Sequence, residues 1–163
     1  MAITLKKKPE LDLHGTRWVH FKLDEETGRL APNPVEEGAD LSLLVASIMN
    51  PLYQSHLALI QRHIARIDQD AGVGTQQFDP AALGEVAYDE QGRLLVALAT
   101  EQLIKDWKGV QEAEEPGIPA EYTPARCKVL LDDYPELYLF AIQTGNDIAV
   151  RVKHRTEETV GKS

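Results

Sequence analysis

The stretch LIKDWKGV, residues 103–110, carries the strongest structural signal in the chain. It closes an apolar run with helical spacing, and an acidic, proline-containing loop follows at residues 112–119. This pattern predicts the end of a helix, because Lys108 suits the last turn of a helix dipole and Gly109 can adopt the left-handed conformation that closes a helix. The indole of Trp107 would then sit at the helix end, with its ring buried and its N–H near water.

Size, charge and cysteine usage bound the class of protein. The 163 residues suffice for one domain with its own core. A net charge of −9 argues against coating nucleic acid or an anionic membrane. No apolar run approaches the roughly 18 residues of a membrane span. Cys127 is the single cysteine and reads as a small apolar core residue, so the composition predicts a soluble protein of a reducing compartment.

The first third of the chain predicts a small β element. Residues 1–15 mix charge with proline and glycine and read as a flexible arm. Residues 16–23 alternate apolar and polar side chains, which is typical of a strand. Residues 24–38 contain two prolines and two glycines and read as a connection. The apolar run 41–49 predicts a second strand, antiparallel to the first.

The middle of the chain reads as helical. Asn50 followed by Pro51 is a helix start, because asparagine caps well and proline is tolerated at the first helical position. Apolar spacing carries this helix to about residue 68. A joint at 70–77 would separate it from a short helix at 80–88 and a longer one at 94–108.

Two more helices are expected toward the C-terminus. Thr123 followed by Pro124 is a second capped start, and Asp132 and Asp133 are placed where the next helix needs an N-cap. The last helix, in which Gly145 allows a bend, carries apolar positions Leu137, Phe140, Ala141, Ile148 and Val152. The fold class is therefore mainly α (α+β): a domain over 16–155 with a β element (16–49), a helical part (50–155) and a disordered tail (156–163).

No constellation of residues predicts catalysis, a cofactor or a metal. His56 and His63 are seven residues apart, whereas a zinc pair on a helix normally sits at i and i+4 with a third ligand nearby. They read instead as half-buried histidines on an apolar face. Gly72-Val73-Gly74 lacks the full spacing of a phosphate loop. We therefore expect a protein that is not an enzyme.

Taken in order, several short motifs resemble one known family, the tail assembly chaperones of long-tailed bacteriophages (siphophages). The resemblance covers about residues 35–155 and rests on these positions: Asn50, Pro51, Asp106, Trp107, Lys108, Gly109, Tyr122, Thr123, Pro124, Leu131 and Asp132. Each motif is weak alone, and their order and spacing carry the resemblance. Trp107, Tyr122 and Leu131 are expected to hold the helices together rather than to contact a partner.

The resemblance implies a non-virion protein of the host cytoplasm. Such a protein binds and solubilises the tape measure protein during tail assembly, and tail tube protein displaces it, engaging a longer frameshifted form where one is made. Self-association is also expected, with no nucleic acid or membrane as partner. The predicted contact surface combines two helices and comprises Leu52, His56, Leu59, His63, Leu137, Phe140 and Ile148.

Two alternatives remain open from the sequence. The rival from another class is a structural virion protein, such as a head–tail connector or tail completion subunit, and its presence in purified particles would favour it. The residues Gly161-Lys162 could be encoded by a slippery heptamer for a −1 frameshift, which would make this chain the shorter of two products. An ordinary polar tail is the other interpretation, and the nucleotide sequence distinguishes the two.

Overall fold

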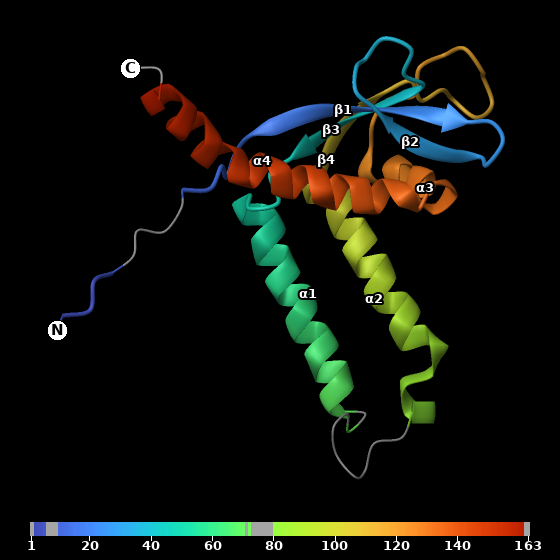
Figure 1. The fold of residues 1–163 in the computed structure, drawn as a ribbon. Coiled ribbons are helices and arrows are strands. Elements are labelled where there is room, and N and C mark those ends of the chain that lie inside the picture. Colours follow the sequence, from blue (N-terminus) through green and yellow to red (C-terminus); the bar gives the residue numbers. More distant parts are fainter. Residues whose placement is uncertain (1, 6–9, 71, 73–79, 162–163) are drawn as a thin grey trace.

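An antiparallel sheet packed against a long helix forms the head of the molecule, and a two-helix hairpin projects from it (Figure 1). The computed structural model describes residues 2–5, 10–70, 72 and 80–161, with side chains except those of 68, 80–90 and 151–161. Within these residues the strands are β1 (Thr16–Asp24), β2 (Arg29–Asn33), β3 (Leu41–Ala46) and β4 (Ile104–Lys108). The helices are α1 (Pro51–Asp70), α2 (Pro80–Gln102), α3 (Pro124–Asp133) and α4 (Glu136–Gly161). The expected fold class, helices with a small antiparallel sheet, is confirmed.

The sheet has the strand order β2-β1-β3-β4, and each neighbouring pair is antiparallel. The predicted pairing of the first strand with the run that begins at Leu41 is confirmed, with Phe21 opposite Leu41 and Val19 opposite Leu43. The expected connection at 24–38 is wrong in part, because it contains β2. Pro32 lies in that strand at the edge of the sheet, where a missing N–H leaves no ladder bond unmade.

The stretch 103–110 is a strand and not the end of a helix, which corrects the central expectation from the sequence. α2 runs as one helix to Gln102, so the separate helices expected at 80–88 and 94–108 are also wrong. β4 then pairs with β3, with a register shift between Leu44 and Val45. This bulge places both Ile104 and Trp107 on the buried face, although they are three residues apart. Gly109 does have a positive φ of 87°, at the end of a strand.

α4 crosses one face of the sheet and covers the main core (Figure 1). The fully buried side chains of that core include Leu43, Val45, Leu103, Ile104 and Leu137. Gly145 allows the close approach of α4 to the sheet, because a Cβ there would lie 3.1 Å from the Ala46 carbonyl oxygen. The helix continues without a break through Gly145 to Gly161, so the tail expected to be disordered from 156 is helical as far as 161.

Asn50 ties the two helices of the hairpin together where they leave the head. Its Oδ1 accepts the Tyr53 N–H at 2.9 Å, which confirms the predicted N-cap of α1. Its Nδ2 donates to the carbonyl of Gln102, the last residue of α2, at 3.0 Å. One side chain therefore satisfies unpaired backbone groups at the start of one helix and at the end of the other.

The remaining helix boundaries are partly as predicted. The Thr123 side chain accepts the Arg126 N–H at 3.1 Å, so the N-cap of α3 is confirmed. Asp132 and Asp133 lie in the last turn of α3 and are exposed, so their expected role as an N-cap of the following helix is wrong. In the N-terminal arm, Asp12 donates its N–H to Ala149 and its carbonyl accepts from Ser47, which anchors that part of the arm to the head. The joint expected at 70–77 lies mostly outside the described residues.

Candidate partner-binding surfaces

The four residues predicted on the first helix form one stripe along α1. Leu52, His56, Leu59 and His63 are spaced by four, three and four residues, which places them on one face of a helix. The Leu52 and Leu59 side chains are 60% and 59% exposed. Large apolar side chains at this spacing are normally covered, so Leu52 and Leu59 are uncovered apolar side chains on a face that they share with two histidines. His56 is half-buried as expected, whereas His63 is exposed.

The stripe borders a shallow groove between the two helices of the hairpin. The groove has a volume of about 270 Å³ and is lined by His56, Leu59, Ile60, Leu94, Ala97, Leu98 and Glu101. α1 packs on α2 along the hairpin, and the head lies at the base of the hairpin (Figure 1). Among the described side chains of α1, Tyr53 alone is fully buried. A two-helix hairpin of this kind leaves room for a third helix along its groove.

The three residues predicted on the last helix do not join this surface. Leu137 is completely buried and Ile148 is 4% exposed, so both belong to the core. Phe140 is half-buried and packs against Phe21 with ring centroids 5.6 Å apart. These three residues therefore do not form a common surface with the α1 stripe. The four residues on α1 remain as the candidate contact surface.

The motif residues around Trp107 and Tyr122 hold the head together, as expected. The Trp107 indole N–H donates to the Ala120 carbonyl at 2.8 Å, and the ring meets that of Tyr122 edge to face at 5.1 Å. The Tyr122 hydroxyl lies 2.6 and 2.7 Å from the carbonyl oxygens of Thr100 and Ile104, so its single O–H proton is shared between them. This shared hydrogen bond links the end of α2 to β4. Leu131 is buried beside them.

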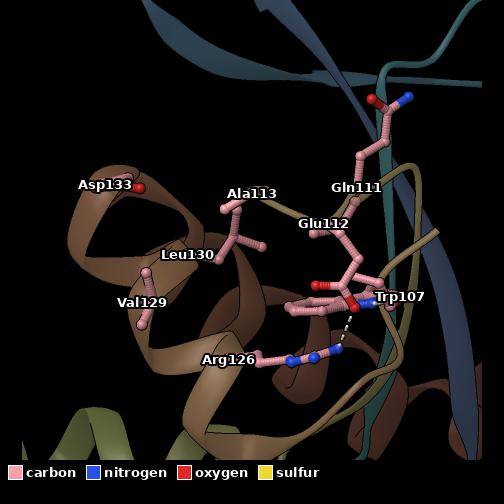
Figure 2. A pocket seen from close by; sticks show the side chains of 10 residues that line it. Trp107, Gln111, Glu112, Ala113, Arg126, Val129, Leu130 and Asp133 are labelled. Carbon is pink, nitrogen blue, oxygen red and sulfur yellow. Dashed lines mark hydrogen bonds and ion pairs between the residues drawn. The ribbon is translucent and has the colours of Figure 1, made fainter. Parts of the chain in front are cut away.

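A second hollow, which the sequence did not predict, lies beside the Trp107 ring (Figure 2). It has a volume of about 310 Å³ between the end of β4, the acidic loop and α3. We call it the Trp107 pocket; it is lined by Trp107, Val110, Gln111, Glu112, Ala113, Ala120, Arg126, Val129, Leu130 and Asp133. One residue of the sequence could have pointed to this pocket: Val129 is an apolar residue of α3, and it is 62% exposed.

Cys127 is a buried residue of α3 that interacts with Tyr122, in agreement with its interpretation as a core residue. Burial raises the pKa of the thiol from 9.0 to about 11, and a hydrogen bond with Tyr122 opposes that shift. Burial likewise raises the pKa of Tyr53 to about 12. A thiol held protonated in this way is a poor nucleophile at neutral pH.

These shifts predict a loss of stability in alkali. The unfolded chain releases the Cys127 proton near pH 9 while the folded chain keeps it to about pH 11, so the folded state binds more protons in this window. The contribution is complete below pH 9 and is lost as the pH rises through 11. Urea unfolding at intervals from pH 8 to 11 should show this fall. The slope between pH 9 and 10 should be shallower in Cys127→Ala, and an unchanged slope would contradict the assignment to the thiol.

The described residues hold no group of three or more His, Cys, Asp or Glu side chains that could bind a metal ion. His56 and His63 lie on the α1 stripe with no such group around them. Within the same residues, no helix is long and apolar enough to cross a membrane.

Comparison with known proteins places this chain in a phage-derived family. The sequence model of the family described as YdaY prophage protein matches residues 48–162, which include the hairpin, β4 and the Trp107 pocket. Protein YdaY of Escherichia coli (strain K12) is 38% identical over 114 residues, or 69% of this chain and 94% of that protein. The chain therefore belongs to the YdaY prophage protein family. No solved structure matches it.

Proposed function

We propose that this protein is a tail assembly chaperone that binds the tape measure protein through the α1–α2 hairpin. The observation that carries the proposal is the pair of uncovered leucines in the α1 stripe, Leu52 and Leu59, which are about three-fifths exposed beside the hairpin groove. The order of motifs that resembles the chaperone family and the phage origin of the chain support it. The protein acts in the host cytoplasm by binding and not by catalysis.

The geometry of the hairpin suits a long helical partner. An amphipathic helix recognises a groove between two helices through apolar side chains at i, i+3, i+4 and i+7. The α1 stripe repeats at that interval, since Leu52 and Leu59 are two helical turns apart. A tape measure protein presents such helices along its length, so several copies of the chaperone can bind side by side.

The net negative charge of the chain also supports the proposal. The chain carries 26 acidic and 17 basic residues, and net charge of one sign keeps complexes dispersed. A partner whose apolar faces are covered by acidic chaperones is protected from self-association until tube subunits replace them. Release by competition requires no nucleotide.

The proposal predicts that charges on the stripe abolish solubilisation. Burying one leucine contributes about 1.5–3 kcal/mol. The double variant Leu52→Asp, Leu59→Asp should therefore weaken binding by about 100-fold or more. The measurement is the soluble fraction of the tape measure protein of the same phage after co-expression with each variant. We expect the parent chain to keep it soluble and the double variant to leave it in the pellet.

A matched control places the same two charges on exposed apolar positions of α4. Leu139 is 62% and Val150 41% exposed, so Leu139→Asp, Val150→Asp should fold and solubilise like the parent. If the tape measure protein precipitates equally with and without the parent chain, the chaperone function is wrong.

Mass spectrometry of purified particles tests the alternative, a structural virion protein, because such a protein would be present in the particles in stoichiometric amounts.

A further inference from the structure

The walls of the Trp107 pocket offer an apolar side chain a preformed place to bind (Figure 2). The indole N–H is already bonded to Ala120, so the ring contributes only apolar surface to the pocket. Val129 forms part of the wall and is 62% exposed. Ile118, on the adjoining loop, is 49% exposed. Covering such surface is favourable by about 25 cal/mol per Å².

The backbone around the pocket is held in place without a ligand. The Ala120 N–H donates to the Val110 carbonyl at 2.8 Å, and the Glu112 N–H donates to the Ile118 carbonyl at 2.9 Å. Arg126 crosses from α3 to the loop, with its guanidinium 3.1 Å from the Glu112 carboxylate. Its Nη1 also donates to the Glu121 carbonyl at 3.0 Å. A pocket fixed in this way loses little ordering entropy when a partner binds.

The charge around the pocket selects the partner. Residues 111–133 carry six carboxylates and two basic side chains, namely Glu112, Glu114, Glu115, Glu121, Asp132 and Asp133 against Arg126 and Lys128. Arg126 is already paired with Glu112, and Asp133 lines the pocket on the other side. The pocket lining itself carries two carboxylates, Glu112 and Asp133, against one guanidinium, and this excess of negative charge favours a cationic partner.

We propose that the Trp107 pocket binds an apolar side chain from a basic amphipathic segment of a partner protein. Its volume of about 310 Å³ is at the lower end of the range for ligand pockets, which suits one or two side chains of a peptide. The apolar residue enters beside Trp107 and Val129, and flanking lysines or arginines meet the acidic rim. The pocket uses none of the residues of the α1 stripe, so this binding does not depend on the proposed chaperone function.

The test uses a synthetic helical peptide of about 14 leucines and lysines at amphipathic spacing, and a matched peptide with glutamate in place of lysine. The chain has two tryptophans, so Trp18→Phe leaves Trp107 as the one indole reporter. In this background we expect the Leu/Lys peptide to change the Trp107 emission saturably. The Leu/Glu peptide should bind at least about tenfold more weakly.

Two aspartate variants separate the pocket from a general attraction between opposite charges. Val129→Asp adds a negative charge in the pocket wall and should weaken binding of the Leu/Lys peptide by about tenfold. Leu139→Asp adds the same charge at an equally exposed position outside the pocket and should leave the affinity unchanged or slightly higher. Circular dichroism checks that each variant is folded.

Attraction by charge alone would make Val129→Asp bind as tightly as the parent or more tightly, and that result would overturn the proposal. Equal binding of the two peptides to the parent would overturn it as well. The variant Leu59→Asp should retain the Trp107 signal in full. Success or failure at the pocket is therefore read separately from success or failure of the hairpin.

Discussion

Replacing Trp107 with alanine is expected to lower the free energy of unfolding by about 3–5 kcal/mol. The side chain is 7% exposed and lies on the buried face of β4, opposite Leu43 of β3. Its removal opens a cavity, takes away the edge-to-face contact with Tyr122, and leaves the Ala120 carbonyl without its indole donor. Since small domains are stable by about 5–15 kcal/mol, the variant should be close to unfolding at 37 °C. Urea unfolding followed by circular dichroism measures the loss.

The other tryptophan supplies the control. Trp18 lies on β1 opposite Leu44, half-buried, with the Lys108 ammonium 4.3 Å from its ring centroid. An exposed cation–π contact contributes about 0.5–1 kcal/mol. Trp18→Ala should therefore cost much less than Trp107→Ala. Equal losses for the two variants would show that the sheet face bearing Trp107 is not the main core.

The second large effect is expected from Gly109→Ala, with a loss of about 3 kcal/mol. The φ angle of 87° is one that residues with a Cβ rarely adopt. A Cβ on this residue would also overlap the carbonyl oxygen of Asp40, in the loop that leads into β3. The substitution therefore strains the backbone and separates β4 from β3. The midpoint of thermal unfolding, measured with the free energy in urea, reports both costs.

Gly38→Ala is the matched control for the conformational part. Its φ of 79° is nearly the same, and no atom lies within 4 Å of the position that a Cβ would take. We expect a loss of about 1–2 kcal/mol from the left-handed conformation alone. The difference between the two variants is then the cost of the overlap with Asp40. If Gly38→Ala is as damaging as Gly109→Ala, the close approach of the two strands is not what Gly109 permits.

Local chemistry at chain boundaries was readable from the sequence. The pairs Asn50-Pro51 and Thr123-Pro124 predicted two helix starts, because capping depends on a side chain and its nearest backbone neighbours. The alternation in 16–23 predicted β1, because the two-residue period of a strand is also a local property of the sequence. β2 was missed because Pro32 argues against a central strand, and the sequence does not say which strand lies at an edge.

The stretch 103–110 misled because a bulged strand can imitate a helix. Buried residues three apart, Ile104 and Trp107, give the spacing of a helical stripe. Here the extra residue of the bulge produces that spacing in a strand. The lysine and glycine that suit a helix end also suit a strand that turns sharply. Only the pairing with Leu43 and Val45, about 60 residues earlier, decides between the two.

For the candidate surfaces, the sequence predicted which residues share a helix face but not which faces are buried. Apolar periodicity placed Leu52 and Leu59 on one face of α1, but it could not show that this face is uncovered. The same reasoning selected Leu137 and Ile148, which are buried in the core. The Trp107 pocket could not be predicted, because its walls come from a strand end, a loop and a helix that meet only in the folded chain.

The hairpin connects two neighbouring strands of the sheet, and this has a consequence for how the family can vary. The chain leaves the sheet after β3 and returns to it as β4, and these two strands are direct neighbours. Everything between them is an excursion that starts and ends at one point, where Asn50 joins the two helices. Insertions or deletions of matched helical turns at the far end change the reach of the hairpin without moving a strand. The length of the hairpin can therefore vary within the family while the head stays the same.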